Sequence, residues 1–192
     1  MARISPLDPP FTPDVAAQLD SMMPAGVAPI GLFRTFARNL PMTVAMSGWG
    51  RYELGRRLSL TMREREIVIV RTCARCRCEY EWGVHLMFFA ERVGLTPAHI
   101  VSLTHGSPDE SPDDQCWTTE RERVLIRVVD ALHDSSDIDD HLWRATRAVM
   151  DEAQLLDLLV LCGWYHAISF AARAARVDLE PGAPRFAEIA AV

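Results

Sequence analysis

The sequence predicts an all-α fold, and three observations support this prediction. The alternation of polar and apolar side chains that marks a half-buried strand is missing throughout the chain. Apolar residues recur at helical spacing behind several capping signals, the first of them at Thr61 and Glu64. Nearly half of the 192 residues are hydrophobic, which is enough to bury a core between packed helices.

The N-terminal segment, residues 1–41, is expected to form a proline-rich arm. It holds seven of the 12 prolines, and long helices cannot run through that spacing. Short helical turns are expected near Asp14–Met22 and Ile30–Asn39. Apolar side chains such as Phe11 and Phe36 favour an arm that packs on its own domain or on a neighbouring copy.

Residues 42–180 are expected to form one helical domain, followed by a tail at 181–192. The first strong helix should begin at the Thr61 capping box and end near the cysteine cluster. A second capping box, Thr119 with Glu122, and caps at Thr96, at Asp137 or Asp139, and at Asp151 predict later helices. The further helices are expected at about 79–93, 97–103, 119–133, 137–150 and 151–177, with a loop at 105–115.

The composition excludes several classes of function. The chain carries a net charge of −6 and no long basic run, so a nucleic-acid partner is not expected. All 20 basic residues are Arg. Schiff-base chemistry and Walker-type phosphate loops both need a Lys, and both are therefore excluded.

The cysteines and the N-terminus favour a reducing, cytoplasmic setting. Three of the five cysteines stand within six residues, and no apolar signal segment precedes them. The longest apolar stretch, Leu155–Ala175, carries Asp157, His166 and Arg173. It is interpreted as a buried helix and not as a membrane span.

Three reactive side chains are predicted to share one face of the helix that starts near Glu79. Cys78, Glu81 and His85 are spaced by three and four residues, and such steps lie on the same side of a helix. Cys78 stands at the helix start, where free N–H groups and the helix dipole favour a thiolate. Glu81 can orient the imidazole of His85.

These residues resemble a known pattern. The peroxidase branch of the carboxymuconolactone decarboxylase and alkylhydroperoxidase D superfamily carries Glu-x11-Cys-x2-Cys-x3-His. Here Glu66, Cys78 and His85 fall on the Glu, the first Cys and the His, while Glu81 occupies the place of the second Cys. The likeness extends over about residues 25–180.

The stretch Tyr80-Glu81-Trp82-x-x-His85 is similar to one branch of this superfamily. The resemblance implies an all-α bundle that assembles as a homo-oligomer (a dimer, trimer or hexamer). It implies two chemistries, neither of which uses a metal or an organic cofactor. One is thiol-dependent reduction of hydroperoxides, and the other is decarboxylation of carboxylated lactones.

The first hypothesis is an antioxidant hydroperoxide reductase of the alkylhydroperoxidase type. The resemblance makes Cys78 the nucleophile, His85 the proton relay and Glu66 the charge that tunes it. Because Glu81 replaces the second Cys, the resolving thiol is expected to be Cys76 or Cys73, or an external thiol.

The substrate pocket is expected to include Tyr80, Trp82 and His166.

A second hypothesis assigns cofactor-free acid–base chemistry, decarboxylation or isomerisation of a lactone or keto acid, to Glu81 and His85. A third is a non-catalytic oligomeric protein that binds a small ligand. Neither a nucleic acid nor a membrane is expected as a partner.

No metal site is expected. A zinc site from the three clustered cysteines and His85 lacks a second Cys/His pair at ordinary spacing. Cys162 and His166 stand four residues apart on one helix, where a buried packing face is favoured over a pair of ligands.

Overall fold

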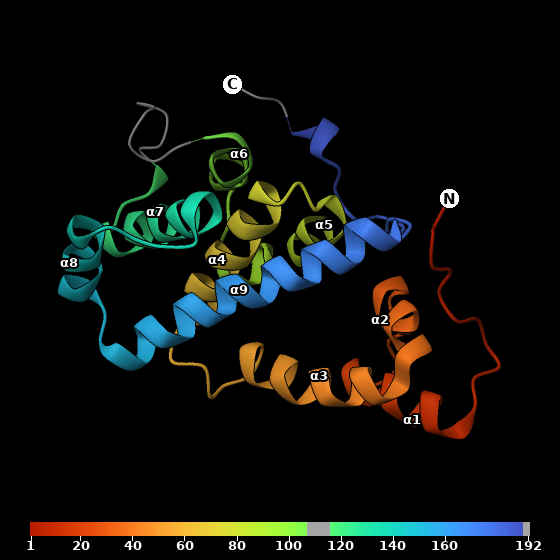
Figure 1. Cartoon of the computed structure of the whole chain (residues 1–192). Coiled ribbons are helices and arrows are strands. Elements are labelled where there is room, and N and C mark those ends of the chain that lie inside the picture. The colour runs from red at the N-terminus through yellow and green to blue at the C-terminus, as the bar shows by residue number, and fades with distance from the viewer. Residues whose placement is uncertain (107–115, 190–192) are drawn as a thin grey trace.

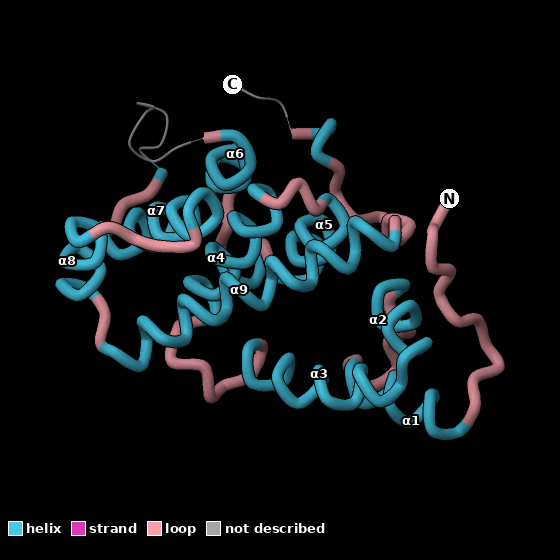
Figure 2. The backbone as a smooth tube through the Cα atoms, in the orientation of Figure 1, coloured by secondary structure: helices cyan, strands magenta, loops and turns pink. Residues whose placement is uncertain are grey.

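The computed structural model describes residues 1–106 and 116–189 of the chain. Within these residues every regular element is a helix, as Figures 1 and 2 show. The predicted all-α fold is therefore confirmed. Most of the loop predicted at 105–115 lies outside the described residues, and residue 105 itself ends a helix.

Helix α4 (Met62–Arg75) forms the centre of the bundle. It packs against α5 (Glu79–Phe89), α6 (Pro97–His105), α7 (Glu120–Ser135) and α9 (Glu152–Ala175), and Figure 1 shows it behind α9. It begins at the predicted capping box, in which Thr61 and Glu64 exchange hydrogen bonds. Because other helices cover α4 on several sides, residues 67–70 are all apolar and all buried, and this part of the helix has no polar face.

The turn between α4 and α5 fixes where the second helix starts. The N–H of Cys78 donates to the carbonyl of Cys73 at 2.8 Å, and the N–H of Arg77 donates to that of Ala74 at 2.9 Å. Arg77 adopts a left-handed conformation with φ of 53°. These features define a Schellman-type helix end, which sets Cys78 as the N-cap of α5.

Most of the later helices begin at the predicted caps. Thr96 caps α6, Asp139 caps α8 (Asp140–Val149) and Asp151 caps α9. The second capping box is only half formed: Thr119 caps α7, but the carboxylate of Glu122 accepts a hydrogen bond from Arg63 instead. Helix α5 is shorter than expected, and a 3-10 turn (Glu91–Val93) completes the segment.

The N-terminal segment is more helical than the sequence predicts. The two expected turns are present as α1 (Pro13–Met22), α2 (Gly31–Phe36) and a 3-10 turn (Ala37–Asn39). A third helix, α3 (Leu40–Glu53), was not predicted. Figure 1 shows α1, α2 and α3 together on one side of α9. The division of the chain into an arm, a domain and a tail remains a prediction.

Helix α9 is long and apolar enough to cross a membrane by length and composition alone. In this fold its buried face packs against α4 and α5, and Asp157 in its second turn accepts a hydrogen bond from the N–H of Ser59 at 2.7 Å. Packing in the core accounts for the apolar residues on this face, whereas Leu156, Val160 and Phe170 of the same helix are exposed. The side chains buried on this face include Leu155, Leu158, Leu161, Tyr165, Ile168 and Ala172.

Candidate active site

A cavity of about 500 Å³ lies between the N-terminal helices and helices α5 and α9. Its walls are mostly apolar side chains from residues 21–54, from α5 and from α9. Among the described residues that line it, the ionisable ones are Arg51, Glu81, His85, Arg92 and Tyr165. A mostly apolar, partly open cavity with a few convergent polar groups is typical of a site for a small organic molecule.

His85 is oriented by a buried carboxylate. Its Nδ1 lies 2.7 Å from Oε2 of Glu66, which is fully buried on α4. The other oxygen of Glu66 pairs with the guanidinium of Arg65 at 2.6 Å. Nδ1 of His85 therefore donates its hydrogen to Glu66, and Nε2 is left as the free, basic nitrogen.

The free nitrogen of His85 meets two further groups. The hydroxyl of Tyr165 on α9 lies 3.0 Å from Nε2, and Oε2 of Glu81 lies 3.6 Å from it. Burial, and then the charges of Glu81 and Glu66, raise the pKa of Tyr165 well above its ordinary value, so the phenol remains a hydrogen-bond donor.

Glu81 is the acid of the site. Burial raises the pKa of its carboxyl above the ordinary value; His85 acts in the opposite direction, and the charge of Glu66 adds to the rise. Glu81 therefore keeps its proton to higher pH than an exposed glutamate. A carboxyl beside an imidazole, both lining the cavity, can give and take a proton.

The cysteines lie apart from this cavity. Cys78 is fully buried, and the described residues that line the cavity do not include it. Burial raises the pKa of its thiol to about 11, although the backbone of Glu81 at the helix start acts in the opposite direction. The expectation that the helix N-terminus favours a thiolate is thus corrected, because desolvation outweighs the dipole.

The two other clustered thiols are also buried. Burial raises the pKa of both Cys73 and Cys76. None of the five cysteines, all of which lie in the described part of the chain, forms a disulfide bond.

Three residues expected in the pocket point elsewhere. Tyr80 and Trp82 stand one position before and after Glu81, and a helix rotates each side chain by about 100° per residue, so they face away from it. The Tyr80 hydroxyl binds the N–H of Leu32, and Nε1 of Trp82 donates to Thr104. His166 lies on α9 beside Cys162.

The sequence reasoning missed two members of the site. Tyr165 stands next to His166 within the stretch Leu155–Ala175, which the sequence predicts only to be a buried helix. Arg65 directly precedes Glu66, and adjacent helix positions usually diverge, yet its long side chain turns back to the carboxylate. No local spacing marks either contact.

No family model and no curated protein matches this sequence. Solved structures do match it in fold. The debrominase Bmp8, in its apo form, superposes with a TM-score of 0.74 at 13% identity over 92% of this chain and 91% of its own. A second solved structure that matches is a cysteine-to-alanine variant of Bmp8 in complex with 2,3,4-tribromopyrrole.

Two uncharacterised peroxidase-related proteins match as well. The one from Ralstonia eutropha JMP134, which has an alkylhydroperoxidase D core, gives a TM-score of 0.74 at 16% identity over 92% of this chain and 93% of its own. The one from Silicibacter sp. TM1040 gives 0.68 at 15% identity over 92% of each chain. The chain therefore has the alkylhydroperoxidase D-like fold along nearly its whole length.

Proposed function

We propose that this protein is a cofactor-free acid–base enzyme acting on a small organic acid. Its reaction is the decarboxylation or isomerisation of a lactone or keto acid. The observation that carries this proposal is the string Arg65–Glu66–His85, which ends at Glu81 and Tyr165 in a mostly apolar, partly open cavity. Such a string orients a base, a protonated acid and a hydrogen-bond donor at one place.

Each side chain has a defined task in a decarboxylation. The bond between the carboxylate and the α carbon breaks, carbon dioxide leaves, and the electron pair moves to the neighbouring carbonyl oxygen as an enolate. The hydroxyl of Tyr165 donates a hydrogen bond to that oxygen. Glu81 then protonates the α carbon, and His85 returns a proton from water to Glu81. The balance needs no oxidant or reductant.

The cavity supports an anionic, otherwise apolar substrate. Its volume falls within the range of about 300–1,000 Å³ typical of small-molecule sites. Arg51 and Arg92 line it, and both are charged at every physiological pH. Their positive charges attract a carboxylate, while the apolar walls accept the carbon skeleton.

The same geometry gives less support to hydroperoxide reduction by Cys78. A nucleophilic thiol must be ionised and must reach its substrate. Burial opposes both for Cys78. The fold itself does not choose between the chemistries, because one protein that shares it is a debrominase and others are peroxidase-related.

The test is proton exchange measured by NMR in D2O with a panel of β-keto acids and carboxylated lactones. The wild-type protein should release carbon dioxide or place deuterium at the α carbon of at least one compound. Glu81→Gln and His85→Asn should each lower kcat by about 10² to 10⁴, the range for loss of a general acid or base. Tyr165→Phe should lower kcat with little change in KM.

Two variants serve as controls. Cys78→Ala should keep its turnover, and so should Glu91→Gln, which removes an exposed carboxylate outside the site. Turnover of an organic hydroperoxide that disappears in Cys78→Ala and survives in Glu81→Gln would instead establish the thiol mechanism. Tight binding of a panel compound without any turnover would establish a ligand-binding protein.

A further inference from the structure

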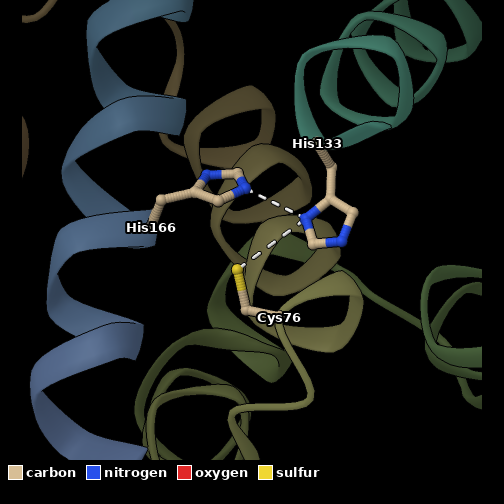
Figure 3. A group of neighbouring side chains, drawn as sticks. All are labelled: Cys76, His133 and His166. Atoms are coloured by element: carbon tan, nitrogen blue, oxygen red, sulfur yellow. Dashed lines mark hydrogen bonds between the residues drawn. The ribbon is translucent and has the colours of Figure 1, made fainter. Parts of the chain in front are cut away.

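A second cluster of reactive side chains lies outside the cavity. Cys76 ends α4, His133 stands near the end of α7, and His166 lies in the middle of α9. Figure 3 shows the three side chains pointing toward one another from these helices. The described residues that line the cavity include none of them, so the proposed reaction leaves the cluster unused.

The distances within the cluster match those of metal ligands. Nδ1 of His133 lies 3.0 Å from Nε2 of His166 and 3.9 Å from Sγ of Cys76. All three ligand atoms lie within 4.8 Å of one another. Around a tetrahedral zinc ion, two imidazole nitrogens are about 3.3 Å apart and a nitrogen and a sulfur about 3.6 Å apart. The His133–His166 and His133–Cys76 separations each differ from these values by about 0.3 Å.

His166 is already held in the form that binds a metal. Its Nδ1 lies 2.8 Å from the carbonyl oxygen of Cys162, to which it donates a hydrogen bond. Nε2 is thereby left without a hydrogen, and its lone pair faces the cluster. A ligating histidine commonly donates its other N–H to a backbone carbonyl, which fixes the ring orientation.

His133 and Cys76 are also suited to a cation. Burial lowers the pKa of His133, and Arg75 and His166 lower it further. Arg75 is itself paired with Asp130 and Asp134, which balance its charge. Burial raises the pKa of Cys76, while Arg173 and Arg75 act in the opposite direction. A bound metal would displace the thiol proton.

We propose that Cys76, His133 and His166 bind a zinc ion. Two imidazoles and one thiolate provide three of the four ligands that zinc takes, and a water molecule completes the set. His133 and His166 are only partly buried, which leaves a path for the ion and the water. The ion would link the ends of α4 and α7 to α9. Sequence spacing could not indicate this site, because Cys76 and His133 are 57 residues apart and His133 and His166 are 33 residues apart.

The test uses the full-length protein after treatment with a chelator. Titration with Zn²⁺ should give one tight site per chain and release about one proton per ion, from Cys76. Titration with Co²⁺ should produce the visible bands of a tetrahedral site and a thiolate charge-transfer band. Cys76→Ser should abolish the charge-transfer band, and His133→Asn and His166→Asn should each weaken Zn²⁺ binding by about 100-fold or more.

The controls separate loss of the site from loss of the fold. His105→Asn removes an exposed histidine and Cys116→Ser removes a thiol outside the cluster, and both should keep wild-type affinity. Zn²⁺ should raise the melting temperature of the wild type and of both controls. A wild-type protein without a stoichiometric Zn²⁺ site would overturn the proposal. So would unchanged Zn²⁺ affinity in a folded Cys76→Ser/His133→Asn double variant.

Discussion

Glu53 illustrates at the residue scale how burial controls a proton. It ends α3 and is 1% exposed, in a part of the fold where Asp157 is the nearest acid acting on it. Burial raises the pKa of its carboxyl to about 7, and the charge of Asp157 adds to the rise, whereas Trp49 acts in the opposite direction. The folded protein therefore keeps a proton that the unfolded chain loses near pH 4.5.

This difference makes stability depend on pH. Between pH 4.5 and about 7 the folded state binds more protons than the unfolded state, so stability falls as the pH rises and then levels off. Glu53→Gln should remove this slope and stabilise the protein at pH 8 by about 2 kcal/mol. Urea unfolding followed by circular dichroism at several pH values measures it. Glu91→Gln, on an exposed turn, should retain the wild-type slope, and a Glu53→Gln protein that also retains it would contradict the argument.

At the scale of elements, the sequence predicts a helix well where a cap and an apolar stripe coincide. Thr61, Thr96 and Asp151 each begin a helix where they were expected to. Helix α3 was missed because Gly48 and Gly50 weaken the helical pattern, and its stability comes from neighbours that local spacing does not reveal. Helix α5 was predicted too long, since its last turn tightens into a 3-10 helix.

The bundle is also joined by a charged pair between elements. Arg71 on α4 is 3% exposed and binds both oxygens of Asp130 on α7 at 2.8 Å. It also donates to the carbonyl of Leu103 at the end of α6. The Arg71 guanidinium thus connects three helices. Removal of the Asp130 carboxylate would leave the positive charge of Arg71 buried without a counter-ion on α7.

Asp130→Asn should therefore destabilise the protein by about 3 kcal/mol, since it breaks a buried pair by removing one partner. Asp134→Asn is the matched control. Asp134 lies on the same face of α7 as Asp130, but its side chain is 63% exposed and pairs with Arg75 of α4, so its loss should cost less than about 1 kcal/mol. Chemical denaturation of the three proteins gives both values, and equal losses for the two variants would refute this assignment.

At the scale of the whole molecule, the site depends on contacts that sequence spacing reveals only in part. The resemblance to a known motif placed Glu66, Glu81 and His85 in the site, and all three meet there. Tyr165 lies 80 residues from His85, and the roof of the cavity comes from the first 54 residues. Such contacts arise from how the helices pack, which a one-dimensional pattern does not contain.

Three distant segments meet beside the cavity at the carboxylate of Glu180. Its Oε1 accepts hydrogen bonds from the N–H of Gly31, at the start of α2, and from the hydroxyl of Tyr80 on α5, both at 2.5 Å. The C-terminal segment then crosses α5 at Gly83, where a Cβ would lie 2.8 Å from the carbonyl oxygen of Pro184. Glu180 and the segment that follows it therefore fasten the N-terminal helices to the core.

Glu180→Ala should loosen the wall of the cavity as well as the tail. The loss of two hydrogen bonds to a carboxylate predicts a destabilisation of about 2–3 kcal/mol. Because Ile30 and Leu32, on either side of Gly31, line the cavity, affinity for a small ligand should also fall. Urea unfolding measures the destabilisation, and limited proteolysis of residues 23–31 measures the loosening of the wall. A double-mutant cycle with Tyr80→Phe tests the cause: the two changes share one hydrogen bond, so their sum should exceed the effect of the double variant. Strict additivity would show that Glu180 does not join these segments.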